Sequence, residues 1–254
     1  MKFVSKIEFA AFRRCGVDTK INELRKMIEQ SDNIVFFGGA GVSTESGIPD
    51  FRSADGLYNQ KYKFPPEQIL SGSFLKSNPE VFYEFYHDKL VLHDVKPNRA
   101  HYRLAALEAE RKLKAVITQN IDGLHQLAGS KKVLELHGTI HRFYCSSCGK
   151  QYPAEKANAC IGVPRCACGG VVRPDVVLYG EQLDDDVLTE SVRLIAAADL
   201  LIVGGTSLNV YPAAGLIRYY KGNWLVLINK EPTVFDSSAS LVIYDKIGDV
   251  MAQV

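Results

Sequence analysis

Apolar residues along this chain gather in short unbroken runs that alternate with segments of helical periodicity. Strands that are buried on both faces of a parallel sheet have this continuous apolar character. We therefore expect parallel strands at the runs NIVFFGG (33–39), KAVIT (114–118), VLELH (133–137), LLIVGG (200–205), WLVLIN (224–229) and LVIY (241–244).

Helical spacing occupies the segments between these runs. Ile21, Leu24, Met27 and Ile28 fall on one face of a helix predicted over 21–30. Further helices are predicted over 79–92, 98–110, 187–198 and 213–220, and at the C-terminal end. Strands and helices that alternate in this way predict an α/β fold with a Rossmann-like, doubly wound parallel sheet.

Two stretches depart from this alternation. Residues 55–92 hold a helical segment with few β-branched runs, and residues 141–173 are rich in cysteine, glycine and proline. We interpret both as inserts that form a small domain, made of a helical module at 58–93 and a second module at 141–173. The large domain would then comprise 19–57, 94–140 and 174–254. Residues 1–18 precede it as an extension, either a short amphipathic helix or a frayed tail.

Charge and hydropathy argue against nucleic-acid and membrane partners. The 254 residues include 30 Lys and Arg against 29 Asp and Glu, a formal net charge of +1, which gives no broad electrostatic footprint. No apolar run approaches the roughly 20 residues of a membrane span. The first residues lack the apolar core and cleavage site of a signal peptide. We expect a cytoplasmic monomer that finds its partners through a specific site.

A glycine-rich turn follows the first predicted strand. Gly39, Gly41 and Thr44 occupy the three glycine positions of the dinucleotide-binding pattern G-x-G-x-x-G, so the third glycine is missing. The first two glycines suffice for a tight turn and for close approach of the backbone to a pyrophosphate. Taken alone, this pattern is equally compatible with an ordinary glycine turn between a strand and a helix that binds no nucleotide.

The segment after this turn is unusual for a simple nucleotide carrier. Gly47 and Pro49 interrupt any long helix and put Asp50 and Arg52 on a loop near the nucleotide. The alternative is a surface loop with a local Asp–Arg pair. A charged loop beside the nucleotide suits a cofactor that reacts better than one that is held as a redox carrier.

A second polar cluster follows the predicted strand KAVIT. Gln119, Asn120, Asp122 and His125 lie just past its carboxyl end, where doubly wound sheets bind ligands. Asn and Asp together can recognise a carboxamide, because one group accepts and the other donates. His137 ends the next predicted strand and is a candidate general base.

Five of the six cysteines lie between positions 145 and 168, which in a cytosolic chain favours a metal over disulfides. Cys145 and Cys148 form one pair, and Cys166 and Cys168 a second pair that is one residue short of the usual spacing. We expect four thiolates that close the coordination sphere of a structural Zn²⁺. Cys160 is either a spare cysteine or the fourth ligand in place of Cys166. Redox pairs are the alternative, which a loop-rich insert disfavours.

The remaining histidines receive simpler interpretations. His87, His93 and His101 lie in or beside helical sequence, where we expect them to be solvated or locally hydrogen-bonded. His141 lies four residues before Cys145 and is a further candidate ligand, although four cysteines already complete a zinc site.

The ordered segments GAGVSTESGIPDFRS, TQNIDGLH, LHGT, the two cysteine pairs, RPDVVLYGE, GTSLNVYPAAG and INKEPTVFD resemble the sirtuins, the NAD-dependent protein deacylases. The resemblance covers roughly residues 19–254. It implies an enzyme that consumes NAD: the acyl group of a lysine passes to ADP-ribose, and nicotinamide and O-acyl-ADP-ribose are released. The large domain would bind NAD, and the 141–173 module would be a zinc ribbon.

The resemblance also implies roles for individual residues. His137 would be the general base, and Asn120 would act with it at the reacting ribose and nicotinamide. The implied NAD-binding residues are Gly39, Ala40, Gly41, Thr44, Asp50, Phe51, Arg52, Gln119, Asn120, Ile121, Asp122, His137, Gly205, Thr206, Ser207, Asn229, Lys230, Lys246 and Ile247.

The protein substrate would be an acyl-lysine peptide that adds as a strand between two segments of the enzyme. These segments hold Val177, Leu178, Tyr179, Gly180 and Glu181 on one side, and Leu208, Asn209 and Val210 on the other. Main-chain hydrogen bonds would supply most of the affinity, so we expect modest sequence selectivity.

One departure concerns the acyl group. Sirtuins that prefer acidic acyl groups carry the pattern Tyr-x-x-Arg on the helix that corresponds to 79–92. In this chain the tyrosine is Tyr86, and Lys89 stands at the position of the arginine. Lysine cannot bind a carboxylate with two parallel hydrogen bonds as arginine does. We therefore expect mainly deacetylation, with O-acetyl-ADP-ribose as the product.

Two other functions remain as alternatives. One is ADP-ribosylation of a protein side chain from the same NAD cleft, and the other is an NAD-sensing or zinc-ribbon binding module without turnover. A base at His137 favours deacylation, because a sensor needs no such group.

Overall fold

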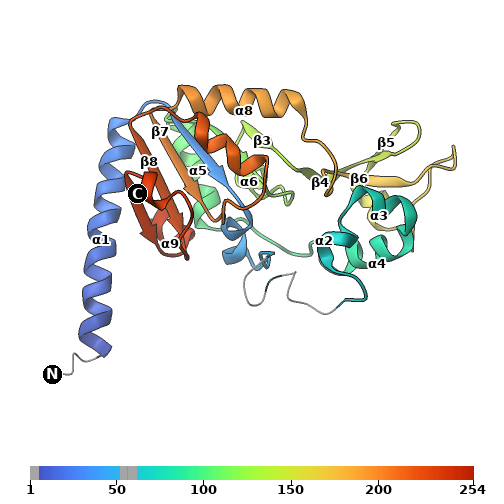
Figure 1. The fold of residues 1–254 in the computed structure, drawn as a ribbon, viewed down its shortest axis with the longest axis horizontal. Coiled ribbons are helices and arrows are strands. Elements are labelled where there is room, and N and C mark those ends of the chain that lie inside the picture. Colours follow the sequence, from blue (N-terminus) through green and yellow to red (C-terminus); the bar gives the residue numbers. More distant parts are fainter. Residues whose placement is uncertain (1–5, 52–55, 57–61) are drawn as a thin grey trace.

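The computed structural model describes residues 6–51, 56 and 62–254, with side chains from residue 17 onward (Figure 1). Its main feature is a sheet of six strands in the order β3-β2-β1-β7-β8-β9, and every neighbouring pair is parallel. The strands are β1 (Ile34–Gly38), β2 (Leu113–Thr118), β3 (Val133–Glu135), β7 (Leu200–Gly204), β8 (Trp224–Asn229) and β9 (Leu241–Tyr244). All six strand predictions are confirmed.

The order of the strands reverses at β1. From β1 the chain proceeds to β2 and β3 on one side, and later to β7, β8 and β9 on the other. A crevice forms at such a point, outside the carboxyl ends of the strands, because the connections on the two sides diverge. The turn after β1 therefore opens directly into this crevice.

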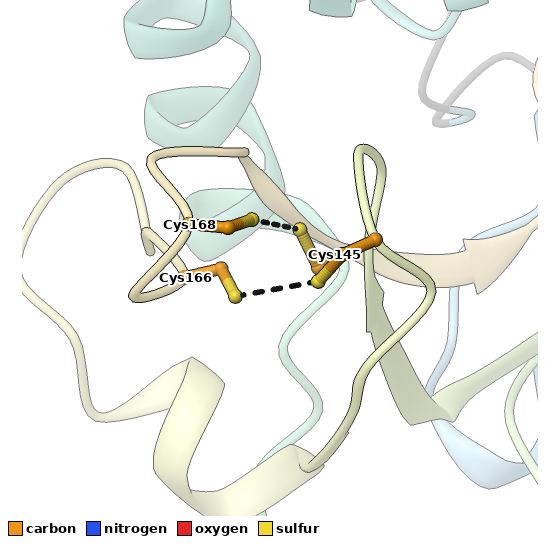
Figure 2. A group of neighbouring side chains, drawn as sticks. Cys145, Cys166 and Cys168 are labelled. Atoms are coloured by element: carbon orange, nitrogen blue, oxygen red, sulfur yellow. Dashed lines mark hydrogen bonds between the residues drawn. The ribbon is translucent and has the colours of Figure 1, made fainter.

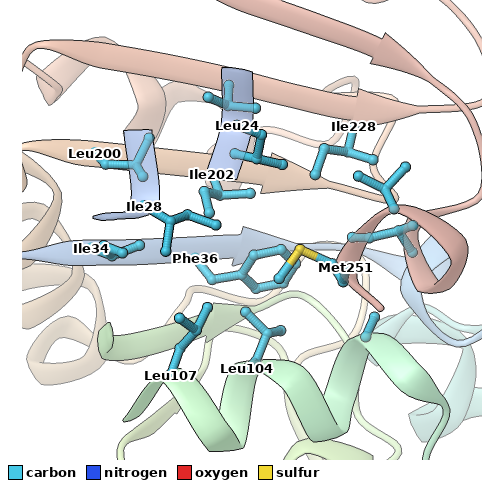
Figure 3. Close-up of a cluster of buried hydrophobic side chains, with 14 of the residues drawn as sticks. Leu24, Ile28, Ile34, Phe36, Leu104, Leu107, Leu200, Ile202, Ile228 and Met251 are labelled. Carbon is cyan, nitrogen blue, oxygen red and sulfur yellow. The ribbon is translucent and has the colours of Figure 1, made fainter. Parts of the chain in front are cut away.

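Each face of the large sheet packs against helices, because successive side chains of a strand point to opposite faces. Ile34 and Phe36 point to the face covered by three helices, and Val35 and Phe37 to the other. Figure 3 shows the first core, with Leu24 and Met251 packed against the sheet. The covering helices are α1 (Lys6–Gln30), α5 (Arg99–Ala109) and α9 (Ile247–Met251) on the first face, and α8 (Asp185–Ala197) on the second.

Two expectations about helices differ from the structure. The predicted 21–30 helix is the C-terminal part of α1, which is continuous from Lys6 and whose N-terminal end extends beyond the sheet (Figure 1). The extension is therefore helical over its described part. The predicted helix at 213–220 is a 3₁₀ helix, η4 (Ala213–Tyr219).

Helix starts follow local capping chemistry. Asn98 caps α5: its side chain accepts a hydrogen bond from the Ala100 amide, and its own amide donates to His101 Nδ1. The Asp184 side chain caps α8 by accepting a hydrogen bond from the Val187 amide at 2.9 Å. Such caps satisfy backbone groups that no intrahelical partner can reach.

A smaller lobe lies beside the large sheet (Figure 1). Its antiparallel sheet has the order β5-β4-β6, and Tyr83, Tyr86 and Phe143 form the centre of a separate core. The strands are β4 (Gly138–Cys145), β5 (Gln151–Pro153) and β6 (Val172–Val176), and the helices are α2 (Pro66–Ile69), α3 (Gly72–Ser77), α4 (Pro79–Lys89) and α7 (Ala154–Asn158). Strands β4 and β6 cross the predicted module limits at 140/141 and 173/174, so the exact domain boundaries remain a prediction. A last short helix, α6 (Leu124–Leu127), follows β2.

Within the described residues, no helix is both long enough and apolar enough to span a membrane.

Candidate active site

A cleft of about 1270 Å³ lies at the carboxyl edge of the large sheet, where it faces the small lobe. Residues immediately after the strands line it: Gly39 follows β1, Gln119 follows β2, Gly205 follows β7 and Lys230 follows β8. His137, two residues past β3, lines it as well. The strand order thus brings together segments that are almost 200 positions apart in the sequence.

The structure places nearly all of the predicted site residues around this one cleft. The predicted residues that line it are Gly39, Ala40, Gly41, Thr44, Asp50, Phe51, Gln119, Asn120, Ile121, Asp122, His137, Val177, Leu178, Tyr179, Gly180, Glu181, Gly205, Thr206, Ser207, Asn209, Val210, Asn229, Lys230, Lys246 and Ile247. Leu208 does not line it, because its side chain is buried in the core beneath the sheet. Arg52 lies outside the described residues.

The glycine turn packs directly against the turn after β7. The Gly41 amide donates to the Gly205 carbonyl at 2.8 Å. A Cβ on Gly41 would lie 2.8 Å from Gly205 Cα, and a Cβ on Gly205 would lie 2.3 Å from the Val42 nitrogen. Gly205 also has a φ of 60°, a conformation that favours glycine. The two turns therefore line the cleft with glycines, Gly39 and Gly41 after β1 and Gly205 after β7.

A hydrogen-bonded triad joins the first turn to the loop after β2. Ser43 Oγ donates to Asp122 Oδ2 at 2.6 Å and accepts from Asn120 Nδ2 at 3.1 Å. The other carboxylate oxygen, Asp122 Oδ1, accepts from the Leu124 amide at 2.9 Å. Asn120 and Asp122 are thereby held as a pair that presents an amide and a carboxylate to the same cleft.

Ser43 is a residue that the sequence reasoning missed. Its side chain is buried and belongs to the segment GAGVSTES, whose predicted site residues are Gly39, Ala40, Gly41 and Thr44. A buried serine inside a polar loop sequence carries no periodic signal, because its partner Asp122 is 79 positions away.

A second network joins the loops after β2, β7 and β8. Gln119 Nε2 donates to Thr206 Oγ1 at 3.0 Å. The Thr206 amide donates to Asn229 Oδ1, and Asn229 Nδ2 donates back to the Thr206 carbonyl, both at 2.9 Å. The positions of three predicted cofactor residues therefore depend on one another.

His137 is held in a defined tautomer. Its Nδ1 lies 2.9 Å from the Gln119 carbonyl oxygen, which can only accept, so Nδ1 carries the hydrogen. Nε2 is then unprotonated in the neutral ring and available as a base. Burial lowers the pKa of His137 below 6.5, although its hydrogen bond to Gln119 opposes that shift. The ring is therefore neutral at physiological pH.

His125, grouped with the polar cluster in the sequence, lies elsewhere. Its ring is buried in the core beside Phe36 and 4.6 Å from the ring of His101. It does not line the large cleft. His101 is fully buried as well, and its expected local hydrogen bond, to the Asn98 amide, is present.

The segment after β6 is tied to the small lobe on one side. The Tyr179 amide donates to the Leu70 carbonyl, and the Gly72 amide donates to the Tyr179 carbonyl. Arg173 binds the Glu181 carboxylate with two nitrogens, the Nη2–Oε2 distance being 2.9 Å, and Glu181 Oε2 also accepts from the Leu178 amide. Burial raises the pKa of Glu181, but the hydrogen bonds from Arg173 and the Leu178 amide, together with the charge of Arg173, outweigh it and leave the pKa lowered.

Tyr86 and Lys89 differ in their access to the cleft. Tyr86 is a fully buried ring of the small-lobe core, as expected for a packed side chain. Lys89 lines the cleft, and its Nζ lies 3.1 Å from Asp88 Oδ2. Lys89 thus presents a cation to the cleft near the small lobe, and this cation is already paired with Asp88.

The four predicted cysteine ligands gather at one point of the small lobe (Figure 2). The four Sγ atoms all lie within 4.8 Å of one another; Cys145 and Cys168 are 3.5 Å apart, and Cys148 and Cys166 are 3.7 Å apart. Four sulfurs in a tetrahedron at about 2.3 Å from Zn²⁺ would be about 3.8 Å apart. The donor set therefore fits a structural zinc, and Cys160 is not part of it.

The chain is similar to known bacterial proteins over most of its length. Residues 39–212 match the Sir2 family. An NAD-dependent protein deacetylase of Clostridium acetobutylicum is 60% identical over 239 residues, which are 92% of this chain and 98% of that protein. One from Clostridium perfringens is 58% identical over 94% of this chain and 99% of that protein. One from Staphylococcus aureus is 47% identical over 91% of this chain and 96% of that protein.

Solved structures of Sir2 proteins have the same fold. One from work on the mechanism and regulation of Sir2 enzymes has a TM-score of 0.86 and 40% identity, and covers 93% of this chain and 96% of that chain. Sir2 with a p53 peptide and NAD⁺ has a TM-score of 0.82, with 41% identity over 92% and 96%. A histidine-to-alanine Sir2 variant with deacetylated p53 peptide and 3'-O-acetyl ADP-ribose has a TM-score of 0.84, also with 41% identity over 92% and 96%.

Proposed function

This chain belongs to the Sir2 family and is an NAD-dependent protein deacetylase, and we propose from this which role each group of cleft residues has in the reaction. The reaction transfers the acetyl group of a lysine to ADP-ribose, with release of nicotinamide and formation of O-acetyl-ADP-ribose. NAD is a co-substrate, and the four-cysteine cluster of the small lobe suits a structural zinc.

We propose that NAD lies along the carboxyl edge of the large sheet. The Gly39–Gly41 turn would face the pyrophosphate, because it lines the cleft directly after β1, where dinucleotide-binding folds hold that group. Thr206 and Asn229, which hold each other through two hydrogen bonds, would bind the adenosine side. Asn120 and Asp122 would bind the nicotinamide carboxamide, since together they offer a donor and an acceptor.

His137 would act as the general base. After the acetyl oxygen attacks the anomeric carbon of the ribose and nicotinamide leaves, Nε2 would accept a proton from a ribose hydroxyl. This role is supported by the hydrogen bond between Nδ1 and the Gln119 carbonyl, which leaves Nε2 unprotonated in the same cleft as the glycine turn. That observation carries the proposed mechanism.

The acetyl-lysine peptide would bind between Val177–Glu181 and Leu208–Val210. The Leu70–Gly72 side of the first segment is already hydrogen-bonded, so the peptide would pair with its opposite side. Val177, Tyr179, Asn209 and Val210 line the cleft there. Sir2 binds acetylated peptide in solved complexes, and the matching fold supports the same use here.

We further propose that the enzyme is monomeric and cytoplasmic. The cleft is assembled from one chain, so no second copy is needed to complete it. Light scattering with size-exclusion chromatography should give a mass near 28.2 kDa. A dimer mass at micromolar concentration would contradict the monomer.

The proposed roles can be tested by turnover. The purified protein would be incubated with NAD and matched acetyl-lysine and succinyl-lysine peptides, and nicotinamide and acyl-ADP-ribose would be followed by mass spectrometry. We expect acetyl transfer to exceed succinyl transfer, and His137→Ala to lower turnover by about 10² to 10⁴-fold, the usual contribution of a general base.

His93→Ala is the matched control, because His93 is exposed and lies outside the cleft. It should retain wild-type turnover. Turnover of His137→Ala within a factor of two of wild type would refute the base assignment while leaving the deacetylase activity itself in place.

A further inference from the structure

His141 reaches from β4 to the loop that follows β2. Its Nε2 lies 2.9 Å from the Asp122 carbonyl oxygen. A carbonyl oxygen only accepts, so His141 Nε2 carries a hydrogen and donates it. This side chain therefore holds the main chain of Asp122, whose carboxylate faces the cleft.

The ring of His141 also packs against the backbone of Gly123. A Cβ on Gly123 would lie 2.7 Å from His141 Cδ2 and Nε2, and Gly123 has a φ of 71°. Both the close contact and the backbone conformation require glycine at this position. The loop is thus shaped so that the imidazole can lie on it.

Strand β4 holds two consecutive carbonyls of the same loop. The Ile140 amide donates to the Ile121 carbonyl at 3.1 Å, and the His141 side chain donates to the next carbonyl, that of Asp122. The first bond is available to any residue at position 140 except proline. The second needs a donor of the right length at position 141.

His141 lies on the side of the loop away from the large cleft. It lines a second cavity of about 370 Å³ together with Asp94 and Leu127, whereas Asp122 lines both cavities. His141 therefore touches neither NAD nor peptide in the proposed arrangement. Its effect on the reaction has to pass through the loop.

We propose that His141 is a positioning residue of the nicotinamide pocket. By holding the Asp122 carbonyl, it fixes the orientation from which the Asp122 carboxylate reaches Ser43 and Asn120 faces the cleft. Loss of the bond frees the 122–123 peptide to rotate and weakens nicotinamide binding, while the peptide segment and the adenosine side keep their contacts. This inference rests on the proposed placement of nicotinamide at Asn120 and Asp122.

The test compares His141→Leu, which removes the donor, with His141→Gln, which keeps one. Two readouts report on the pocket: the inhibition constant of nicotinamide, and the rate at which labelled nicotinamide exchanges into NAD. We expect His141→Leu to raise the inhibition constant about fivefold to tenfold, the effect of one hydrogen bond, and to slow exchange similarly. The KM for acetyl-peptide should change less than about twofold, and His141→Gln should restore both readouts.

Two reference variants make the result decisive. His93→Leu, at an exposed histidine outside both cavities, should leave nicotinamide inhibition unchanged. Asp122→Asn should weaken nicotinamide inhibition if the pocket is where the proposed function puts it.

If the inhibition constant of nicotinamide were unchanged in His141→Leu but raised in Asp122→Asn, the positioning role of His141 would be overturned and the proposed nicotinamide pocket would stand. The positioning role would also be overturned if His141→Leu raised the KM for NAD and the KM for acetyl-peptide together and lowered the melting temperature, and His141→Gln did not reverse these changes. Such a pattern is expected of a residue that only stabilises the fold. No effect in Asp122→Asn would refute the proposed pocket and the role of His141 with it.

Discussion

At the scale of single residues, hydrogen bonds to backbone carbonyls decide what the site histidines can do. The Gln119 carbonyl fixes the proton of His137 on Nδ1, and the Asp122 carbonyl fixes that of His141 on Nε2. Only His137 lines the large cleft. Two rings with the same chemistry would thereby serve the two proposed roles, His137 in proton transfer and His141 in positioning.

The pH profile of deacetylation should report the base. The pKa of His137 is lowered below 6.5, mainly by burial, so the ring is neutral at pH 7 and gains a proton only under more acidic conditions. We expect kcat/KM to be flat from about pH 7 to 8 and to fall by up to about tenfold per pH unit below the lowered pKa. Initial rates of O-acetyl-ADP-ribose formation would measure this profile, and return to pH 7.5 would control for unfolding. An inflection above pH 7 would contradict it.

At the scale of elements, the small lobe carries the segment that is proposed to bind peptide. Strand β6 leads directly from the cysteine cluster to Val177–Glu181, and β4 leads from His137 to the first cysteine. The zinc ribbon and the cleft are thus connected by two strands. Loss of order in the zinc ribbon should therefore displace His137 and the Val177–Glu181 segment, to which these strands lead.

Removal of the metal should therefore abolish turnover without the zinc taking part in the chemistry. Four thiolates leave no coordination position for water or substrate. We expect about one zinc per chain by elemental analysis, and loss of both metal and activity in Cys166→Ser. Cys160→Ser is the control, because Cys160 lies outside the cluster and should keep zinc and turnover. Full activity of zinc-free Cys166→Ser would disprove the coupling.

Arg173 offers a more selective test of the same element. It is buried and binds Glu181 with two nitrogens, so Arg173→Met should loosen Val177–Glu181 and leave the Glu181 carboxylate without its cation. We expect the KM for acetyl-peptide to rise about tenfold or more, since hydrogen bonds to charged groups are the stronger ones. The KM for NAD should change less than about twofold.

Arg193→Met supplies the comparison for Arg173→Met. Arg193 is a 61% exposed arginine on α8 that pairs with Glu190, and its replacement should alter neither constant. Equal increases in both KM values for Arg173→Met would show a general loss of structure instead of an effect on the peptide segment.

At the scale of the whole molecule, two buried histidines make stability depend on pH. Burial lowers the pKa of His101 to about 4 against the opposing charge of Asp122, and burial with repulsion from His101 lowers the pKa of His125 to about 3. An unfolded histidine titrates near 6.5, so between these values the unfolded chain binds more protons than the folded one. We therefore expect these two histidines to cost no stability above about pH 6.5 and to lower it progressively as pH decreases.

Urea unfolding at several pH values would measure this linkage. The free energy of unfolding should decrease by up to about 1.4 kcal/mol per pH unit for each histidine below pH 6.5. His125→Leu should reduce that slope, whereas His93→Leu, at an exposed position, should not. A slope that is the same in wild type and His125→Leu would exclude His125 as a source.

The sequence by itself determined the large sheet and the cysteine cluster. Strands buried on both faces must be continuously apolar, so runs such as IVFFG and LLIVG are visible without a structure. Cysteine spacing likewise exposes the zinc ligands, because two tight turns can present four thiolates. Both signals are local, and both survive in a single sequence.

Only the tertiary structure decided which polar residues face the cleft and which support it from behind. His125 belongs to the same motif as Asn120 but lies in the core, Leu208 lies beneath the surface, and Ser43 and His141 hold the Asp122 loop from opposite sides. Strand β4 also escaped prediction, and its pairing with β6, from which 26 residues separate it, is not visible in the local sequence. Pairings between distant segments depend on how the whole chain packs, and residue type and periodicity do not encode that packing locally.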